Sequence, residues 1–198
     1  ENRKLTRANE LLIDNREDPG MSLGKDILVA DYNNDGVLDF YIYDHGVGTH
    51  DGFRDSYFLS QSNGTWLESS STHLSHPNFQ VFDHGGAVGD IDNDGDMDVV
   101  ITESNWKTGT LLWCLVNDGT GFLKKRKCGG EWSFALELAD MNGDGYLDVI
   151  LGSQEWHTHF KPFTGIIWND GRGNFNKNNK TNLQKHKKLG GIPEVSAA

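Results

Sequence analysis

The nine residues DIDNDGDMD, at 90–98, follow a pattern that occurs twice more in the chain, as DYNNDGVLD at 31–39 and DMNGDGYLD at 140–148. All three read D-x-[DN]-x-D-G-x-x-D. Together they hold eleven of the 29 acidic residues, and the other 18 acidic residues balance the 18 Lys and Arg residues. The net charge of −11 is therefore confined to three short loops. Such confinement favours neutralisation by a small cation.

The spacing of the oxygen-bearing side chains predicts calcium loops. Side chains at positions 1, 3 and 5 converge when the backbone curls, the glycine at position 6 permits the turn, position 7 offers its carbonyl, and position 9 completes the shell. Hard oxygen donors suit Ca²⁺ better than the smaller Mg²⁺ or soft metals. We expect about three structural calcium ions, held by Asp31, Asn33, Asp35, Val37, Asp39, Asp90, Asp92, Asp94, Asp96, Asp98, Asp140, Asn142, Asp144, Tyr146 and Asp148.

Two other interpretations compete with calcium loops. An EF-hand begins in the same way but needs a bidentate Glu at position 12, where this chain has Ile42, Ile101 and Leu151. The EF-hand is therefore excluded. Ordinary Asp/Asn/Gly turns without metal remain the alternative, although three repeats of one nine-residue pattern argue against it.

A longer repeat surrounds the loops. Short apolar runs rich in β-branched residues precede and follow each loop, and each unit ends in an Asn-Gly or Asn-Asp-Gly turn: SNGTW at 62–66, NDGTGF at 117–122 and NDGRGNF at 169–175. No segment shows helical periodicity. Each unit therefore predicts four antiparallel strands, with inner strands buried on both faces. Tandem units of this size indicate an all-β fold of about three β-propeller blades.

These motifs resemble the FG-GAP/VCBS repeats of integrin-like calcium-binding propellers and of many secreted bacterial proteins, over about residues 25–177. SNGTW departs from the fuller turn of that family. Three blades do not close a propeller ring, so we expect further blades in the same parent chain or self-association. The expected divisions are an N-terminal segment at 1–24, a candidate outer strand of an adjacent blade; blades at 25–70, 71–128 and 129–180; and a tail or the start of a further blade at 181–198.

Composition bounds the partners and the compartment. The net acidity argues against nucleic acid as a partner, and no apolar run is long enough for a membrane span.

Cys114 and Cys128 flank the NDGTG turn, where either a cross-strand disulfide or two free thiols is compatible with the sequence. Loops of this kind fill at extracellular calcium levels. We therefore expect an extracellular, cell-surface or periplasmic location.

The connections opposite the calcium loops predict a recognition surface for a glycan or protein. They are long and rich in aromatic and polar residues, and the connection at 70–79 is expected on the same rim. Binding or adhesion is the favoured function. A purely architectural or assembly module is the first alternative, and a lyase-like enzyme acting on polysaccharides is the second, although catalysis is the less favoured class. The candidate ligand residues are His45, His50, Asp51, Arg54, Trp106, Trp156, His157 and His159.

Overall fold

The computed structural model describes residues 9–17, 24–45, 54–78, 83–105, 109–131, 133–152 and 163–183. The predicted positions His50, Asp51, Trp106, Trp156, His157 and His159 lie outside these ranges. Within the described part, no helix combines the length and the apolar character needed to cross a membrane.

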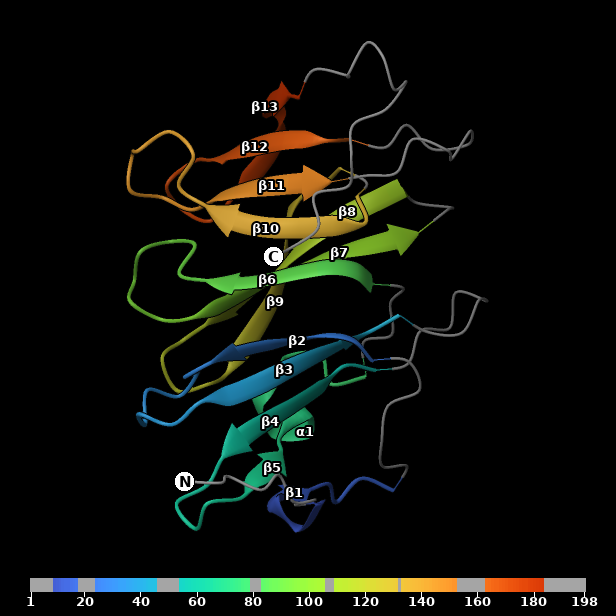
Figure 1. Cartoon of the computed structure of the whole chain (residues 1–198), viewed down its shortest axis with the longest axis vertical. Helices are drawn as coiled ribbons and strands as arrows, with labels where there is room; N and C mark the ends of the chain where they lie inside the picture. Colours follow the sequence, from blue (N-terminus) through green and yellow to red (C-terminus); the bar gives the residue numbers. More distant parts are fainter. Residues whose placement is uncertain are drawn as a thin grey trace, which may run out of the picture.

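Three four-stranded antiparallel units make up the fold, which confirms the all-β, propeller-like architecture. Blade 1 contains β2 (Gly24–Ala30), β3 (Asp39–Asp44), β4 (Ser56–Ser60) and β5 (Trp66–Glu68). Blade 2 contains β6 (Asp83–Gly89), β7 (Asp98–Asn105), β8 (Gly109–Asn117) and β9 (Leu123–Gly129). Blade 3 contains β10 (Ala135–Ala139), β11 (Asp148–Gly152), β12 (Gly165–Asn169) and β13 (Phe175–Asn182). In Figure 1 the inner strands β10, β6 and β2 follow one another, with β6 packed between the other two.

The N-terminal segment adds to blade 1 instead of an adjacent blade. After a short 3-10 helix η1 (Asn9–Leu11), β1 (Leu12–Ile13) pairs in parallel with the outer strand β5. At the other end, β13 continues to Asn182, two residues into the segment expected to be a tail. Blade 1 is therefore five strands wide.

Blades 2 and 3 join at their outer edges, where a single parallel pair, Phe175 with Gly129, unites them into one eight-stranded sheet. Gly129 permits this approach, because a Cβ there would lie 2.4 Å from the carbonyl oxygen of Phe175. A side chain larger than that of glycine at position 129 would therefore push β9 and β13 apart.

Two hydrophobic clusters hold the blades face to face. The first lies between blades 1 and 2 and includes Tyr41, Tyr57, Val99 and Leu115. The second lies between blades 2 and 3 and is made of Ala87, Ile91, Val100, Leu112, Cys114, Cys128, Leu136, Val149, Leu151, Phe163, Ile167 and Phe175. Blade 2 is therefore covered on both faces, while blades 1 and 3 each contribute one face.

The expectation that every inner strand is buried on both faces is wrong for β2. Leu28 and Ala30 are buried against blade 2, whereas Ile27 and Val29 are 55% and 50% exposed on the other face. The apolar run does form a strand. Blade 1 covers the equivalent face of blade 2, and blade 2 covers that of blade 3, but no described residue covers this face of blade 1.

Candidate metal centre

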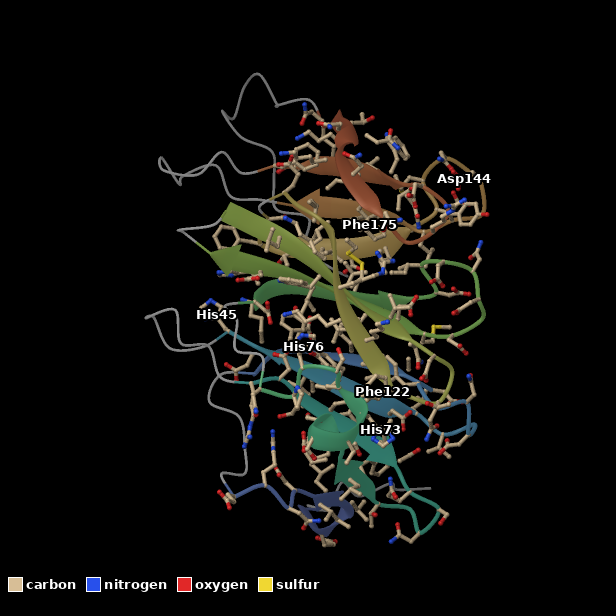
Figure 2. The ribbon with its side chains drawn as sticks, turned by 180° about the vertical axis from the view of Figure 1, so that it is seen from behind. His45, His73, His76, Phe122, Asp144 and Phe175 are labelled. Carbon is tan, nitrogen blue, oxygen red and sulfur yellow. A yellow bond between two sulfur atoms is a disulfide. The ribbon has the colours of Figure 1, made fainter. Side chains whose placement is uncertain are left out.

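The three nonapeptides form the connections β2–β3, β6–β7 and β10–β11, and they lie together on one rim of the arc, here called the loop rim (Figure 1). Figure 2 shows Asp144 on this rim and His45 on the opposite side of the molecule. The loops and His45 thus lie on opposite rims, as the sequence predicted, because successive strands run in opposite directions.

In each loop, the aspartate side chain at position 1 holds the backbone in a closed turn. Asp90 accepts hydrogen bonds from the backbone N–H groups of Asp94 (3.2 Å) and Gly95 (3.0 Å), one on each carboxylate oxygen. Asp31 and Asp140 make the equivalent bonds in the other two loops. Asp94 in turn accepts from the N–H of Asp96 at 3.0 Å. The pattern folds a closed turn with its carboxylates on the inside, which is the arrangement that a cation requires.

The ninth residue of each loop ties the loop to the third strand of its blade. Asp98 is fully buried, and its two oxygens accept the N–H groups of Ile91 (3.1 Å) and Asn117 (2.8 Å). Asp39 and Asp148 are also fully buried and repeat these bonds. These three aspartates therefore stabilise the blade in addition to their predicted role as ligands.

The second loop has the most complete set of acidic donors. Asp90, Asp92 and Asp98 each place a carboxylate oxygen within 4.8 Å of the others, and among the described residues they are the one such group of His, Cys, Asp or Glu. The Oδ1 atom of Asp92 is buried and has no hydrogen-bond partner in the described part of the chain. A divalent cation fits this set, because it would supply the missing partner and hard oxygen is its preferred donor.

Electrostatics in this loop point the same way. Burial, followed by the charges of Asp94 and Asp90, raises the pKa of Asp92. Burial likewise raises the pKa of Asp98 to about 7, against the opposing effect of its backbone hydrogen bonds. The protein alone thus leaves these carboxylates poorly compensated, and a bound cation would lower both pKa values.

Sequence reasoning missed a set of asparagines that join neighbouring blades at the loop rim. The Asn117 amide donates to the carbonyl of Tyr32 in blade 1 (2.7 Å), and the Asn169 amide donates to the carbonyl of Ile91 in blade 2 (2.8 Å). The equivalent residue of blade 1 is Ser60, whose backbone N–H donates to the Asp39 carboxylate. The first Asn of the repeated NDG turn is the available signal, but the motif alone identifies it only as a turn residue.

A second asparagine bond runs in the opposite direction. Asn34 and Asn93, each at position 4 of its loop with positive φ, donate to Asp96 Oδ1 (2.8 Å) and to the Gly145 carbonyl (3.0 Å) of the following loops. Asn is among the few residues that adopt this backbone region readily. Adjacent loops are therefore bonded to one another directly.

The repeat seen in the loops, strands and turns is also recognised at the level of sequence families. The model of the FG-GAP-like repeat matches twice, over residues 31–101 and 90–151, so that each match begins at the first aspartate of a loop. The two matches together span more than half of the chain. The chain belongs to the FG-GAP-like repeat family. No curated protein matches the sequence as a relative.

On the rim opposite the loops, the FG-GAP repeats bring two histidines together. The ring of His45, after β3, lies edge-to-face against that of His84 in β6, with centroids 4.6 Å apart. His84 makes the same kind of contact with Phe134, at 4.5 Å. His45 therefore lies at the junction between blades 1 and 2, where the inner strand of blade 2 begins.

Arg54 belongs to a different surface. It lines an open hollow at the outer edge of blade 1 together with Asn15, Arg16, Glu17, Glu68 and Ser71. The connection at 70–79 also differs from expectation, because after α1 (Ser70–His73), which packs on β4, the chain joins the outer strand β9: Leu74 bridges Leu123, and the Ser75 N–H donates to the Leu123 carbonyl (Figure 2). His73 and His76 are thus placed by the outer strands of the repeats.

A disulfide staples the outer hairpin of the second repeat. Cys114 on β8 and Cys128 on β9 are bonded, with their Cα atoms 5.7 Å apart. Cys114 is fully buried in the cluster between blades 2 and 3. Of the two alternatives that the sequence left open, the structure contains the disulfide.

Proposed function

We propose that this chain is a calcium-stabilised propeller module that acts outside the cytoplasm and binds a glycan or protein through the rim opposite the loops. The observation that carries the calcium assignment is the convergence of Asp90, Asp92 and Asp98, with one buried Asp92 oxygen lacking a partner among the described residues. The other two loops have aspartates at positions 1, 5 and 9 and an asparagine in place of Asp92, at Asn33 and Asn142. Three Ca²⁺ ions would reduce the formal net negative charge from −11 to about −5.

An oxidising compartment supports the location. The Cys114–Cys128 disulfide uses both cysteines of the chain, and structural disulfides persist mainly in secreted, periplasmic or surface proteins. Calcium concentrations there also match the weaker classes of calcium loop.

The calcium assignment is tested by Asp92→Ala, with Asp26→Ala on the exposed part of β2 as the control. We expect Asp92→Ala to lose about one bound ion in titration calorimetry and about a third of the calcium-induced rise in melting temperature. In chelator, the same variant should melt at or above the wild-type temperature, because it removes a carboxylate that burial and its neighbours destabilise. Equal losses with calcium and with chelator would mean that Asp92 is only a turn residue.

The recognition surface is tested at His45. The purified chain, with calcium present, is applied to immobilised neutral and uronic-acid glycans, and bound ligands are titrated against His45→Ala and the control His73→Ala. We expect His45→Ala to weaken binding about tenfold or more and His73→Ala to leave it unchanged, since His73 lies by the outer strands. Binding that is indifferent to His45 would contradict the assignment of this rim.

A second candidate function, assembly, is favoured by one observation. Val29, Val88 and Leu138 each precede the first aspartate of a loop by two residues, so they occupy equivalent positions in the three blades. Val88 and Leu138 pack on the preceding blade, whereas Val29 is 50% exposed. The outward face of blade 1 therefore has the pattern that receives another blade, either from the same parent chain or from a second copy.

A further inference from the structure

The junction of blades 1 and 2 contains a cluster of buried ionisable groups, separate from the loops and nearer the opposite rim. Blade 2 contributes Asp83, Glu103 and Lys125, and blade 1 contributes Asp55 and Asp44. Asp83 and Asp44 are fully buried, Asp55 is 4% exposed and Glu103 is 9% exposed. Among the described residues, these four carboxylates and the Lys125 ammonium group influence one another in a poorly hydrated site.

Asp83 is the unusual member of this cluster. Neither of its carboxylate oxygens has a hydrogen-bond partner within the described residues. Asp55, by contrast, accepts the hydroxyl of Tyr41 and, at 3.0 Å, the N–H of Asp44. An ionised carboxylate with neither hydration nor hydrogen bonds is strongly disfavoured inside a protein, because nothing replaces the water that it loses. Burial without these partners favours the protonated or cation-bound form of Asp83.

Lys125 does not neutralise the whole cluster. Its Nζ atom lies 3.8 Å from the centre of the Trp113 ring, and burial lowers its pKa to about 7 against the attraction of Glu103, Asp83 and Asp55. A single ammonium whose own charge is weakened by burial balances at most one of these carboxylates. Asp83, which has no hydrogen-bond partner among the described residues, is the carboxylate that this ammonium leaves least compensated.

A proton fits the site better than a metal ion. Within the described part of the chain, the one trio of acidic or imidazole donors within 4.8 Å of one another is in the loop at 90–98, at the other end of β6 from Asp83. Among the described residues, a metal at Asp83 would accordingly lack a shell of acidic or imidazole ligands. The charge of Asp55 raises the pKa of Asp83, and two carboxyl groups buried in one site commonly retain one proton between them.

We propose that Asp55 and Asp83 form a proton-binding site between blades 1 and 2, and that loss of the proton weakens the packing of one blade on the other. The groups that face this pair from the elements around it are Asp44, Tyr41 and Tyr43 of β3, Glu103 of β7, Lys125 of β9, and His76 after α1, which lines one hollow with Asp55 and Lys125. His84 follows Asp83 in β6 and contacts His45. The proton-binding site therefore adjoins, along β6, a histidine of the opposite rim.

The sign of the pH effect follows from the direction of the pKa shifts. Burial, and then Asp55, raises the pKa of Asp83 well above its usual value, and burial raises the pKa of Asp55 to about 7. Between the unfolded pKa, about 4, and the folded pKa, the native state holds the proton that the unfolded chain has released. This pair therefore makes the fold less stable as pH rises through that window. The lowered pKa of Lys125 acts in the opposite direction, and only above about pH 7.

The first experiment compares Asp83→Asn with the wild type in melting temperature from about pH 4 to about pH 8, in saturating calcium so that the loops stay in one state. Asn keeps the shape of the side chain without ionising. We expect the melting temperature of Asp83→Asn, relative to wild type, to rise by roughly 5–10 °C across this range. The exposed control Glu10→Gln should show no such trend. A difference that does not vary with pH would overturn the proposal.

The second experiment begins with the wild-type chain alone. Carbon-detected NMR of its aspartate carboxyl groups, in saturating calcium so that the loop carboxylates hold the ion, should show one or two that are protonated near neutral pH and titrate above about pH 6. Their absence would overturn the proposal. So would a melting temperature at about pH 8 that added K⁺ or Mg²⁺ raises in the wild type but not in Asp83→Asn, because a cation would then be the occupant. Neither experiment depends on the recognition function of the rim.

Discussion

At the scale of single residues, Asn169 performs three tasks with one amide. Its Nδ2 atom donates to the carbonyls of Ile91 (2.8 Å) and Leu147 (2.9 Å), and its Oδ1 accepts the N–H groups of Gly171 and Gly173 in the hairpin turn. The side chain therefore fixes the turn, the loop of its own blade and the loop of the preceding blade. Asn117 repeats this arrangement one blade earlier.

We expect Asn169→Ala to lower the free energy of unfolding by about 3 kcal/mol, because several buried backbone groups lose their partner at once. Urea denaturation followed by tryptophan fluorescence measures this loss. Asn178→Ala, at an exposed position of β13, is the matched control and should change stability by less than about 0.5 kcal/mol. Similar effects from the two variants would show that the inter-blade bond is dispensable.

Among the elements, the outward face of β2 in blade 1 is the surface through which this chain would associate with another blade. Val29→Lys places a charge on an exposed position of β2 and leaves the packing of Leu28 on blade 2 intact. If this face receives another blade, wild-type chain should associate with increasing concentration and Val29→Lys should not. Sedimentation equilibrium with calcium present measures both. A wild type that stays monomeric at high concentration, or a variant that associates equally well, would contradict self-association through β2.

Local sequence signals predicted the elements of this fold well. Glycine at position 6, aspartates at positions 1, 5 and 9, and Asp or Asn at position 3 have local consequences, so the turns and the strands that flank them follow directly from the residues. The exposure of Ile27 and Val29 does not, because an apolar run does not tell whether a neighbouring blade is present. The course of 70–78 along β9 was missed for a related reason, since it depends on a long-range bond between Ser75 and Leu123.

At the scale of the whole molecule, the arc is built from contacts that repeat from blade to blade. Hydrophobic clusters fill the two junctions, and asparagine bonds link successive loops at one rim. The cluster around Asp83 differs, because it occurs at the first junction and brings Asp83 of blade 2 against Asp55 of blade 1. No motif marks such a site in the sequence: it arises when two strands from different blades pack together.

Whether cations hold the loop rim of this arc together is tested most directly by a thermal melt of the wild-type chain in saturating calcium and in chelator, with bound calcium counted in the same sample. We expect about three ions per chain and a melting temperature higher by roughly 10 °C or more with calcium, because three sites that bind only the folded state add their stabilisation. Equal melting temperatures and no bound calcium would contradict it, and the nonapeptides would then be turns held by their own hydrogen bonds.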